Sequence, residues 1–238
     1  MKDLLTVKKL RVTVADQELL ADLSFKLAAG EIAALMGANG AGKSTLGRAL
    51  MGDPDYMVEA EELSLNGKNL LDLEIEARAQ AGMAYIWQQA PEIKGVELFS
   101  LLNLIQQLHD GDYDYQLADP LLFRETNVGF SGGEKKIAEL VQVLNQKPKL
   151  IIIDELDSGL DIENLDKVLS ALKKEVQQQK IAILLITHSG AVLEELKPDR
   201  IMIMRQGKII CQSQKIEQVL NTIKEYGYQK CEQCQNCL

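Results

Sequence analysis

A glycine-rich segment near the N-terminus carries the strongest chemical signal in the sequence. Residues 37–44 read Gly-Ala-Asn-Gly-Ala-Gly-Lys-Ser, which matches the pattern G-x-x-x-x-G-K-[ST]. In such a loop the backbone N–H groups turn inward around phosphate oxygens, and the lysine adds a full positive charge. We predict that Lys43 binds the β- and γ-phosphates of a nucleotide and that Ser44 ligates Mg²⁺; the alternative is a glycine-rich turn that merely caps a helix. The predicted binding residues are Gly37, Ala38, Asn39, Gly40, Ala41, Gly42, Lys43, Ser44 and Thr45.

Two adjacent carboxylates, Asp154 and Glu155, follow the apolar run at residues 150–153. Asp154 is suited to holding Mg²⁺ through its water shell, and Glu155 to orienting and polarising an attacking water. Phosphoryl transfer asks a protein for little beyond such positioning and charge stabilisation. Taken alone, the pair also fits an acidic strand end before a turn, but together with the phosphate loop it predicts a catalytic role.

Ser131, Gly132 and Gly133 form a second candidate anion site. Ser131 and Glu134 have the spacing of a capping box, so a plain helix start is the simplest interpretation. However, each glycine at a helix start costs roughly 1 kcal/mol relative to alanine, and capping gives no reason to keep two. A serine hydroxyl, bare backbone N–H groups and a helix N-terminus together suit a terminal phosphate.

Two further polar residues are candidates because of where they fall. His188 follows the apolar run at residues 181–186, and we predict that it contacts the γ-phosphate, although a histidine at a strand end is usually a surface residue. Gln88, in Ile-Trp-Gln-Gln, would be interpreted as an ordinary loop residue if it stood alone.

The elements that must position these residues follow from hydrophobic patterning. Apolar runs at 32–36, 150–153 and 181–186 do not alternate, as expected of parallel strands buried on both faces. Ligands bind beyond the carboxyl ends of such strands, which is where the candidate residues lie. Residues 4–27 instead alternate and predict a smaller antiparallel sheet. Periods of 3.6 residues predict helices around residues 137–144 and 162–172, and another from about 97 to 109.

Composition excludes several classes of protein. The 238 residues carry a formal charge of −9, and 46% are hydrophobic, so the chain can bury a core and its acidic balance disfavours nucleic-acid binding. The longest apolar runs are far shorter than the roughly 20 residues that span a bilayer. The first residues lack the pattern of a secretory signal, and the four cysteines lie at 211, 231, 234 and 237. We therefore expect a cytoplasmic protein without membrane insertion.

The order of these motifs resembles the ATP-binding cassette (ABC) family. That resemblance implies an α/β fold: a P-loop NTPase core with a small antiparallel β-subdomain and an inserted helical subdomain. The division it implies is a nucleotide-binding core with the β-subdomain at 1–88 and 146–238, a helical subdomain with the signature at 89–145, and a cysteine-rich tail at 229–238.

The same resemblance implies an ATPase that uses ATP and Mg²⁺. It assigns catalysis to Glu155, His188 and Gln88, and metal binding to Ser44, Gln88 and Asp154. It also implies an ATP-dependent head-to-tail homodimer in which the phosphate loop of one protomer faces residues 131–133 of the other. The γ-phosphate would join the two protomers, and hydrolysis would release them.

Within the family the chain most resembles the soluble ATPases of Suf iron–sulfur cluster assembly systems. The resemblance rests on residues 91–96, 127–136, 154–162 and 225–228; transporter ATPases usually have Leu and Gln at positions 130 and 134, where this chain has Phe and Glu. It implies docking to Suf-type scaffold proteins (SufB- and SufD-like) and no nucleic acid. The ATPase subunit of an ABC membrane transporter is the main alternative, and a nucleotide-gated clamp on nucleic acid is a third.

Two departures from the family pattern stand out. No aromatic residue for stacking on adenine occurs near residues 14–18, which leaves the choice of base open. The tail Cys231-Glu-Gln-Cys234-Gln-Asn-Cys237 has metal-ligand spacing, although three thiolates are one short of a closed site. We predict that the tail binds iron or zinc; an exposed terminus with unliganded thiols and a redox role are the alternatives.

Overall fold

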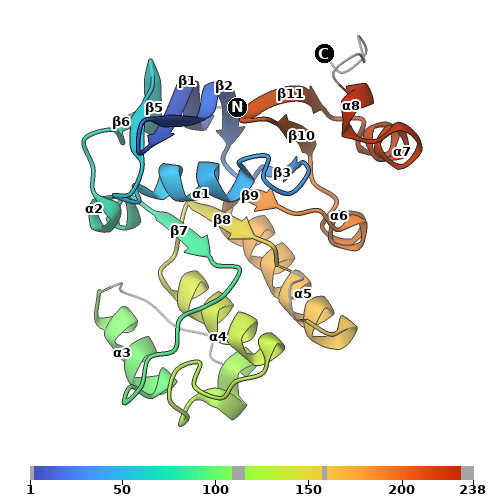
Figure 1. Ribbon diagram of the computed structural model, residues 1–238. Helices are drawn as coiled ribbons and strands as arrows, with labels where there is room; N and C mark the ends of the chain where they lie inside the picture. The colour runs from blue at the N-terminus through green and yellow to red at the C-terminus, as the bar shows by residue number, and fades with distance from the viewer. Residues whose placement is uncertain (1–2, 109–115, 157–159, 232–238) are drawn as a thin grey trace.

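Two β-sheets lie one above the other with a helix between them, and the remaining helices lie below and beside them (Figure 1). The computed structural model describes residues 3–108, 116–156 and 160–231. The smaller sheet is antiparallel, in the order β2-β1-β5-β6 with β4 beside β1. Its strands are β1 (Asp3–Val14), β2 (Gln17–Ala28), β4 (Met57–Glu59), β5 (Glu62–Leu65) and β6 (Lys68–Asn69). The predicted antiparallel sheet from residues 4–27 is confirmed.

The larger sheet has the strand order β11-β10-β3-β9-β8-β7, and every pair is parallel except β10 with β11. Its strands are β3 (Ile32–Met36), β7 (Met83–Ile86), β8 (Leu150–Asp154), β9 (Ala182–Ile186), β10 (Arg200–Arg205) and β11 (Lys208–Ser213). Every residue of β3, β7, β8 and β9 is buried, as the unbroken apolar runs predicted. The carboxyl ends of β3, β8 and β9 therefore meet at one edge.

Helices cover both faces of the parallel sheet and create two cores. α1 (Lys43–Met51) lies between the two sheets, where Leu46 and Leu50 are fully buried (Figure 1). The opposite face is covered by α4 (Gly132–Asn145), α5 (Ile162–Gln179) and α6 (Gly190–Leu196), with α7 (Ile216–Tyr226) against the same core. The short helices α2 (Ile75–Gln80) and α8 (Tyr228–Cys231) complete the described part of these layers.

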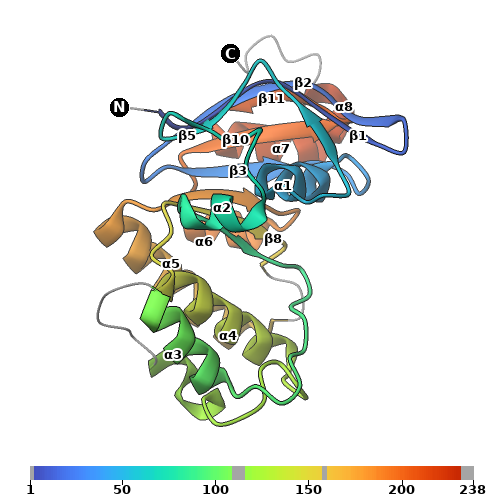
Figure 2. The same cartoon turned by 90° about the vertical axis from the view of Figure 1, so that its left-hand side faces the viewer.

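A group of helices projects from the lower end of the molecule (Figures 1 and 2). It consists of α3 (Leu98–Leu108), the 3-10 helix η1 (Gln116–Leu121) and α4, which runs back to the parallel sheet. The helix expected from 97 to 109 forms, while residues 109–115 lie outside the described part. The fold class is confirmed: a P-loop NTPase core with a small antiparallel subdomain and an inserted helical subdomain. Within the described ranges, no helix is both long and apolar enough to cross a bilayer.

The turn between β10 and β11 packs against the glycine-rich loop and forms a hydrogen bond with it. Gly207 donates its N–H to the carbonyl oxygen of Ala41 at 3.0 Å, and its own carbonyl oxygen accepts from Ala21 at 3.0 Å. Its φ is 73°, and a Cβ placed on it would lie 2.2 Å from the carbonyl oxygen of Leu19. Glycine is required here because backbone from three elements meets at one point.

We expect Gly207→Ala to destabilise the protein more than Gly67→Ala. Both glycines have positive φ, but a Cβ on Gly67 would meet open space. The Gly67 variant should lose about 1 kcal/mol from its backbone conformation alone, and the Gly207 variant about 2 kcal/mol more from overpacking. Denaturant unfolding of the two variants measures the difference. Equal losses would mean that the contact with Leu19 relaxes without cost.

Candidate nucleotide-binding site

The glycine-rich loop joins β3 to α1 and is shaped by contacts that exclude side chains. A Cβ on Gly37 would lie 2.2 Å from the carbonyl oxygen of Met204, and one on Gly42 would lie 2.5 Å from Leu20 Cδ2. Gly40 and Gly42 have φ of 76° and 102°, a region that favours glycine. The loop is therefore held tightly from behind, while its front opens into a pocket of about 420 Å³.

Lys43 places its charge inside this loop. The residue is 7% exposed, and its Nζ donates to the carbonyl oxygens of Gly37 at 2.9 Å and Ala38 at 3.1 Å. Burial lowers the pKa of Lys43, and the carboxylates of Glu155 and Asp154 oppose that shift. A cation poorly solvated by neutral carbonyls attracts a multiply charged anion strongly.

Most of the site residues predicted from the sequence line this pocket. Four segments contribute these residues: the glycine-rich loop with the start of α1, and the segments that follow β7, β8 and β9. The predicted residues on its lining are Asn39, Gly40, Gly42, Lys43, Ser44, Thr45, Gln88, Glu155 and His188. Leu19 of β2 also lines it, and the described lining has no aromatic side chain that could stack on a base.

Glu155 lies at the centre of a small polar network. Its Oε2 accepts from Nε2 of Gln88, and its Oε1 lies 3.3 Å from Nδ1 of His188. Its backbone N–H donates to the carbonyl oxygen of Ile186 at 2.9 Å, which places the residue against β9. Glu155 also has a φ of 51°, a costly conformation for a residue with a side chain. The three residues predicted to be catalytic thus meet, although they are far apart in sequence.

Asp154 is buried beside this network with one oxygen unsatisfied. The residue is 4% exposed, and its Oδ2 accepts from the hydroxyl of Tyr85 at 2.9 Å. Burial and the neighbouring carboxylate raise the pKa of Tyr85, which keeps its hydroxyl a donor. Oδ1 of Asp154 is buried and has no hydrogen-bond partner among the described residues. A carboxylate oxygen left in this state fits a water of a Mg²⁺ shell, which supplies the missing donor.

The donor types also suit Mg²⁺. The predicted ligands are the hydroxyl of Ser44, the side-chain amide of Gln88 and the carboxylate of Asp154, all hard oxygen donors. Outside the masked residues, no cluster of three or more His, Cys, Asp or Glu side chains forms a metal-binding group. A site of this kind would thus depend on phosphate oxygens and waters for its remaining ligands.

The signature residues Ser131, Gly132 and Gly133 are not among the described residues that line the phosphate pocket of their own chain, although Gly132 and Gln88 line a neighbouring one. Ser131 caps α4: its hydroxyl accepts from the Glu134 N–H at 3.2 Å, and Glu134 Oε2 accepts from the Ser131 N–H at 2.7 Å. Gly133 also has a packing reason that sequence reasoning missed, because a Cβ there would lie 2.8 Å from Nδ2 of Asn164.

Arg124, which no sequence pattern predicted, contacts three residues that flank the signature residues 131–133. Its guanidinium lies 4.4 Å from the ring centroid of Phe130, donates to Glu134 Oε1 at 2.7 Å and donates to the Gly129 carbonyl oxygen at 3.1 Å. Phe130 and Glu134 are the two positions where the sequence departs from the usual transporter signature. One arginine therefore contacts both side chains, and only the tertiary structure brings the three together.

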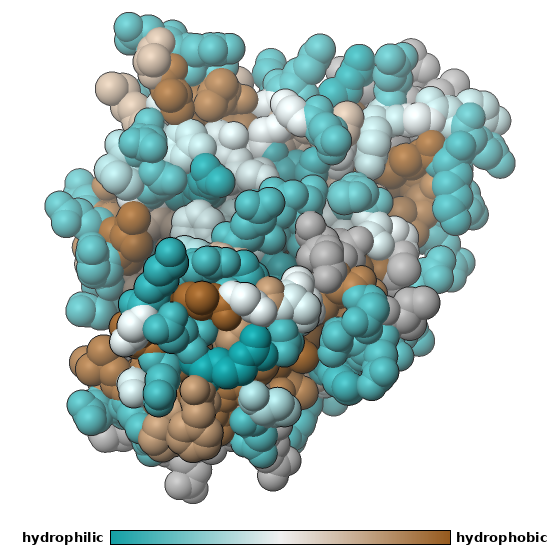
Figure 3. Space-filling model, turned by 60° about the horizontal axis from the view of Figure 1, so that its bottom comes forward, coloured by the Kyte–Doolittle hydropathy of each residue, from teal (hydrophilic) through white to brown (hydrophobic). Residues whose placement is uncertain are grey.

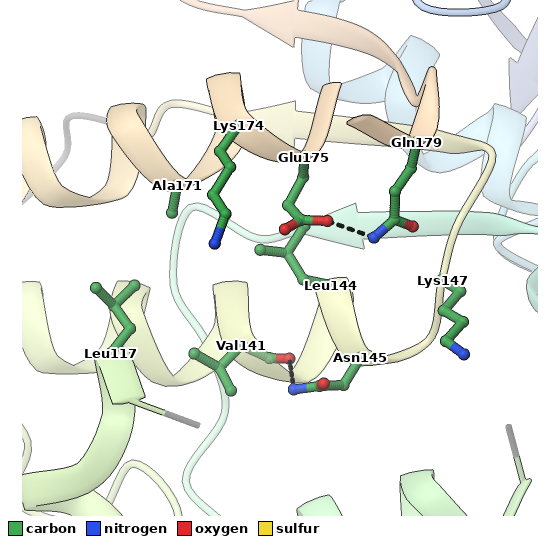
Figure 4. Close-up of a pocket in the computed structure, with 9 residues that line it drawn as sticks. All are labelled: Leu117, Val141, Leu144, Asn145, Lys147, Ala171, Lys174, Glu175 and Gln179. Carbon is green, nitrogen blue, oxygen red and sulfur yellow. Dashed lines mark hydrogen bonds between the residues drawn. The ribbon is translucent and has the colours of Figure 1, made fainter. Parts of the chain in front are cut away.

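A second pocket, of about 140 Å³, lies between α4 and α5 (Figure 4). Leu117, Val141 and Leu144 form its apolar side, and Asn145 donates to the carbonyl oxygen of Val141 at 2.8 Å. Gln179 donates to Glu175 across the opposite wall. These polar groups satisfy one another, and none of the predicted chemistry falls here.

The cysteine-rich tail cannot be placed with the site. Residues 232–238 lie outside the described part of the chain, and so do residues 157–159 of the segment after Glu155. Cys211, the fourth cysteine of the sequence, lies in β11 and is 5% exposed. The predicted iron or zinc site therefore stays a prediction.

The fold and the pocket define a P-loop nucleotide-binding cassette. A family model described as "ABC transporter" matches residues 20–158. The chain belongs to the ABC family of ATPases, as its motifs predicted.

Relatives of nearly full length place the chain near SufC-type ATPases. It is 37% identical to the probable ATP-dependent transporter SufC of Escherichia coli, over 87% of this chain and 91% of that one. It is also 37% identical to vegetative protein 296 of Bacillus subtilis, over 87% and 85%. A probable ABC transporter ATP-binding protein of Streptococcus pyogenes is 35% identical over 87% of each chain. The resemblance to SufC found in the sequence is confirmed.

Solved structures agree on the fold. A nucleotide-free ATP-binding cassette from an ABC transporter superposes with a TM-score of 0.79 at 19% identity, covering 97% of this chain and 98% of that one. A dimeric structure of a bacterial ABC transporter cassette superposes with a TM-score of 0.75 at 17% identity, covering 88% and 97%.

We expect Lys43→Ala to lower nucleotide affinity by at least about tenfold, because a charge-assisted contact to phosphate is lost. Isothermal titration with ATP and with ADP measures the change. Lys167→Ala, which removes an exposed lysine of α5, is the matched control and should bind as the wild type does. Unchanged affinity in the folded Lys43 variant would contradict the assignment of the loop.

Proposed function

We propose that this protein is a soluble, Mg²⁺-dependent ATPase that powers conformational change in an iron–sulfur cluster assembly scaffold. The observation that carries the ATPase proposal is the network of Glu155, Gln88 and His188 at the mouth of the pocket that contains Lys43. A carboxylate next to a phosphate-binding cation can orient a water for attack, and the Gln88 amide and the His188 ring at its two oxygens fix its position.

The roles follow from position. The glycine-rich loop and Lys43 hold the triphosphate, and Ser44, Gln88 and Asp154 hold Mg²⁺, which supplies charge neutralisation at the phosphates. Glu155 accepts the proton of the attacking water, and His188 contacts the γ-phosphate. Residues 37–42 provide backbone N–H groups, and Thr45 lies in the first turn of α1, whose positive end faces the same oxygens.

Both oxygens of the Glu155 carboxylate have a neighbouring side chain. Gln88 donates to one oxygen and His188 faces the other. A γ-phosphate would compete for both partners, because a terminal phosphate carries more negative charge than a single carboxylate. Binding of ATP with Mg²⁺ would thereby release Glu155 for catalysis.

Completion of the site requires a second copy of the chain. Ser131, Gly132 and Gly133 form a predicted anion site, but they do not line the phosphate pocket of their own chain. A head-to-tail homodimer brings the signature of one protomer to the γ-phosphate of the other. The solved dimer of a related cassette supports this proposal at the level of fold. ATP shifts the equilibrium because it binds the dimer more tightly than the monomer.

The lower helical end offers the surface for a partner. Exposed apolar side chains gather on and near α3: Ile93, Leu104, Leu108 and Phe123 are 36–74% exposed. Figure 3, which brings this end forward, shows apolar atoms among hydrophilic ones. Ile93 lies five residues after Gln88, so docking here would sense the nucleotide state. We assign this surface to a SufB- or SufD-like scaffold in the cytoplasm, on the strength of the resemblance to SufC.

The ATPase subunit of an ABC membrane transporter is the second candidate. The names of several relatives favour it, including the Streptococcus pyogenes protein at 35% identity. Such a subunit would use the same nucleotide residues and would dock to a permease through the same surface. The contacts of Arg124 with Phe130 and Glu134 favour the first candidate, because both positions differ from the usual transporter signature.

We expect Glu155→Gln to bind ATP but to turn it over at least about 100-fold more slowly, since the water loses its base. The variant should accumulate as a dimer with ATP and Mg²⁺, which size-exclusion chromatography with light scattering measures. Adding Ser131→Arg to this variant should restore the monomer while ATP binding persists. Normal turnover in Glu155→Gln would remove Glu155 from the chemistry, and a dimer that survives Ser131→Arg would contradict the head-to-tail arrangement.

Affinity purification of the Glu155→Gln variant from its native cells tests the partner. We expect water-soluble scaffold proteins to co-purify, and Leu108→Glu with Phe123→Glu to abolish their binding without affecting ATP affinity. Recovery of integral membrane proteins would instead establish the transporter subunit, and recovery of nucleic acid would exclude both proposals.

A further inference from the structure

The backbone of Trp87, immediately before Gln88, is held on both sides by two side chains of α4. The N–H of Trp87 donates to Oε1 of Glu139 at 2.7 Å. Its carbonyl oxygen accepts from Nζ of Lys136. Nζ of Lys136 lies 3.7 Å from Oε2 of Glu139, so the two side chains also form an ion pair. We call these three residues the Trp87 clamp.

The two charged side chains of the clamp are buried, and stability alone does not explain them. The side chains of Lys136 and Glu139 are 3% and 8% exposed. Burial raises the pKa of Glu139 to about 7 and lowers that of Lys136, while each partner opposes the shift of the other. Oε2 of Glu139 accepts no hydrogen bond from the described residues. Replacing a buried ion pair by apolar side chains of similar volume often costs no stability. A role in holding the Trp87 backbone therefore explains this pair better than stability does.

The Trp87 clamp lies between the catalytic network and the start of α4. Trp87 follows the end of β7, and Gln88 reaches from the next residue to the carboxylate of Glu155. α4, which supplies the clamp, begins at the signature residues Ser131 to Gly133. Any tilt of α4 therefore displaces the backbone from which Gln88 extends.

We propose that Glu139 is a positioning residue for Gln88: by accepting the N–H of Trp87, with Lys136 on the carbonyl oxygen, it fixes the backbone from which Gln88 reaches the reaction centre and couples α4 to that centre. This inference rests on the proposed ATPase function. It assigns to α4 a contact with the catalytic network of its own chain, separate from the contact that its N-terminus makes with the partner's nucleotide.

Trp87 reports on the clamp directly. It is the single tryptophan in the sequence. Its ring is 4.7 Å from that of Tyr85, and the guanidinium of Arg48 lies 5.8 Å from its centroid. The side chain is 40% exposed, so its emission and its quenching by acrylamide depend on how the backbone is held.

The test compares Glu139→Met with Glu139→Gln. Gln keeps a carbonyl oxygen to accept the Trp87 N–H, whereas Met has similar length and no acceptor of comparable strength. We expect Glu139→Met to lower kcat at least about tenfold, because small displacements of a positioned group are costly. KM for ATP should change little, since the phosphate loop is untouched. The emission maximum and the quenching of Trp87 should shift in the Met variant, and Gln should restore both readouts.

Three controls make the result interpretable. Glu163→Met, at an exposed position of α5, should behave as the wild type. If Glu139→Met does not fold, the same Met and Gln substitutions are compared in a Lys136→Met background, where no buried charge is left unpaired. Gln88→Ala sets the loss expected when the positioned group itself is absent.

Several outcomes would overturn the proposal. Wild-type kcat and emission in folded Glu139→Met would do so, as would equal losses in the Met and Gln variants, which would point to charge and not to the hydrogen bond. If Gln88→Ala lowers turnover and Glu139→Met does not, this inference fails and the proposed function stands. If Gln88→Ala leaves turnover unchanged, the role of Gln88 in the proposed function fails.

Discussion

A buried ammonium group is the interaction on which the rest of the site depends. Nζ of Lys43 is surrounded by the loop that carries it and donates to two backbone carbonyl oxygens, which satisfy two of its three hydrogens without neutralising its charge. The loop can enclose it because glycine stands wherever backbone from β10 or the side chain of Leu20 presses against the loop. A cation held in this way lowers the free energy of any phosphate that enters.

The parallel sheet brings the other functional side chains close to this charge. β3, β8 and β9 are neighbours, and all their residues are buried, so their carboxyl ends deliver Lys43, Glu155 and His188 to the same edge. Tyr85, from the adjacent β7, supports Asp154 from beneath. The strained φ of Glu155 is consistent with this role, because strain of this kind is retained where surrounding structure and function require it.

The helical end connects the reaction centre to the outside of the molecule. α4 carries residues 131–133 at its start, and Lys136 and Glu139 of the Trp87 clamp follow about one and two turns later. In the proposed dimer, this one helix would contact the partner's nucleotide and hold the backbone next to the chain's own Gln88. Arg124 fixes the start of that helix through Phe130 and Glu134. In the proposed mechanism, nucleotide state, dimerisation and partner docking are thereby transmitted through α4.

The sequence by itself determined the phosphate loop, the buried parallel strands and the candidate residues at their ends, because these depend on local patterns: glycines at fixed spacing, unbroken apolar runs and a capping box at Ser131. The tertiary structure decided which side chains touch. The contacts of Glu155 with Gln88 and His188, of Asp154 with Tyr85, and of Glu139 with the Trp87 backbone join residues 33–69 positions apart. A periodic sequence pattern cannot predict such pairs, because the residues become neighbours only when the strands and helices pack together.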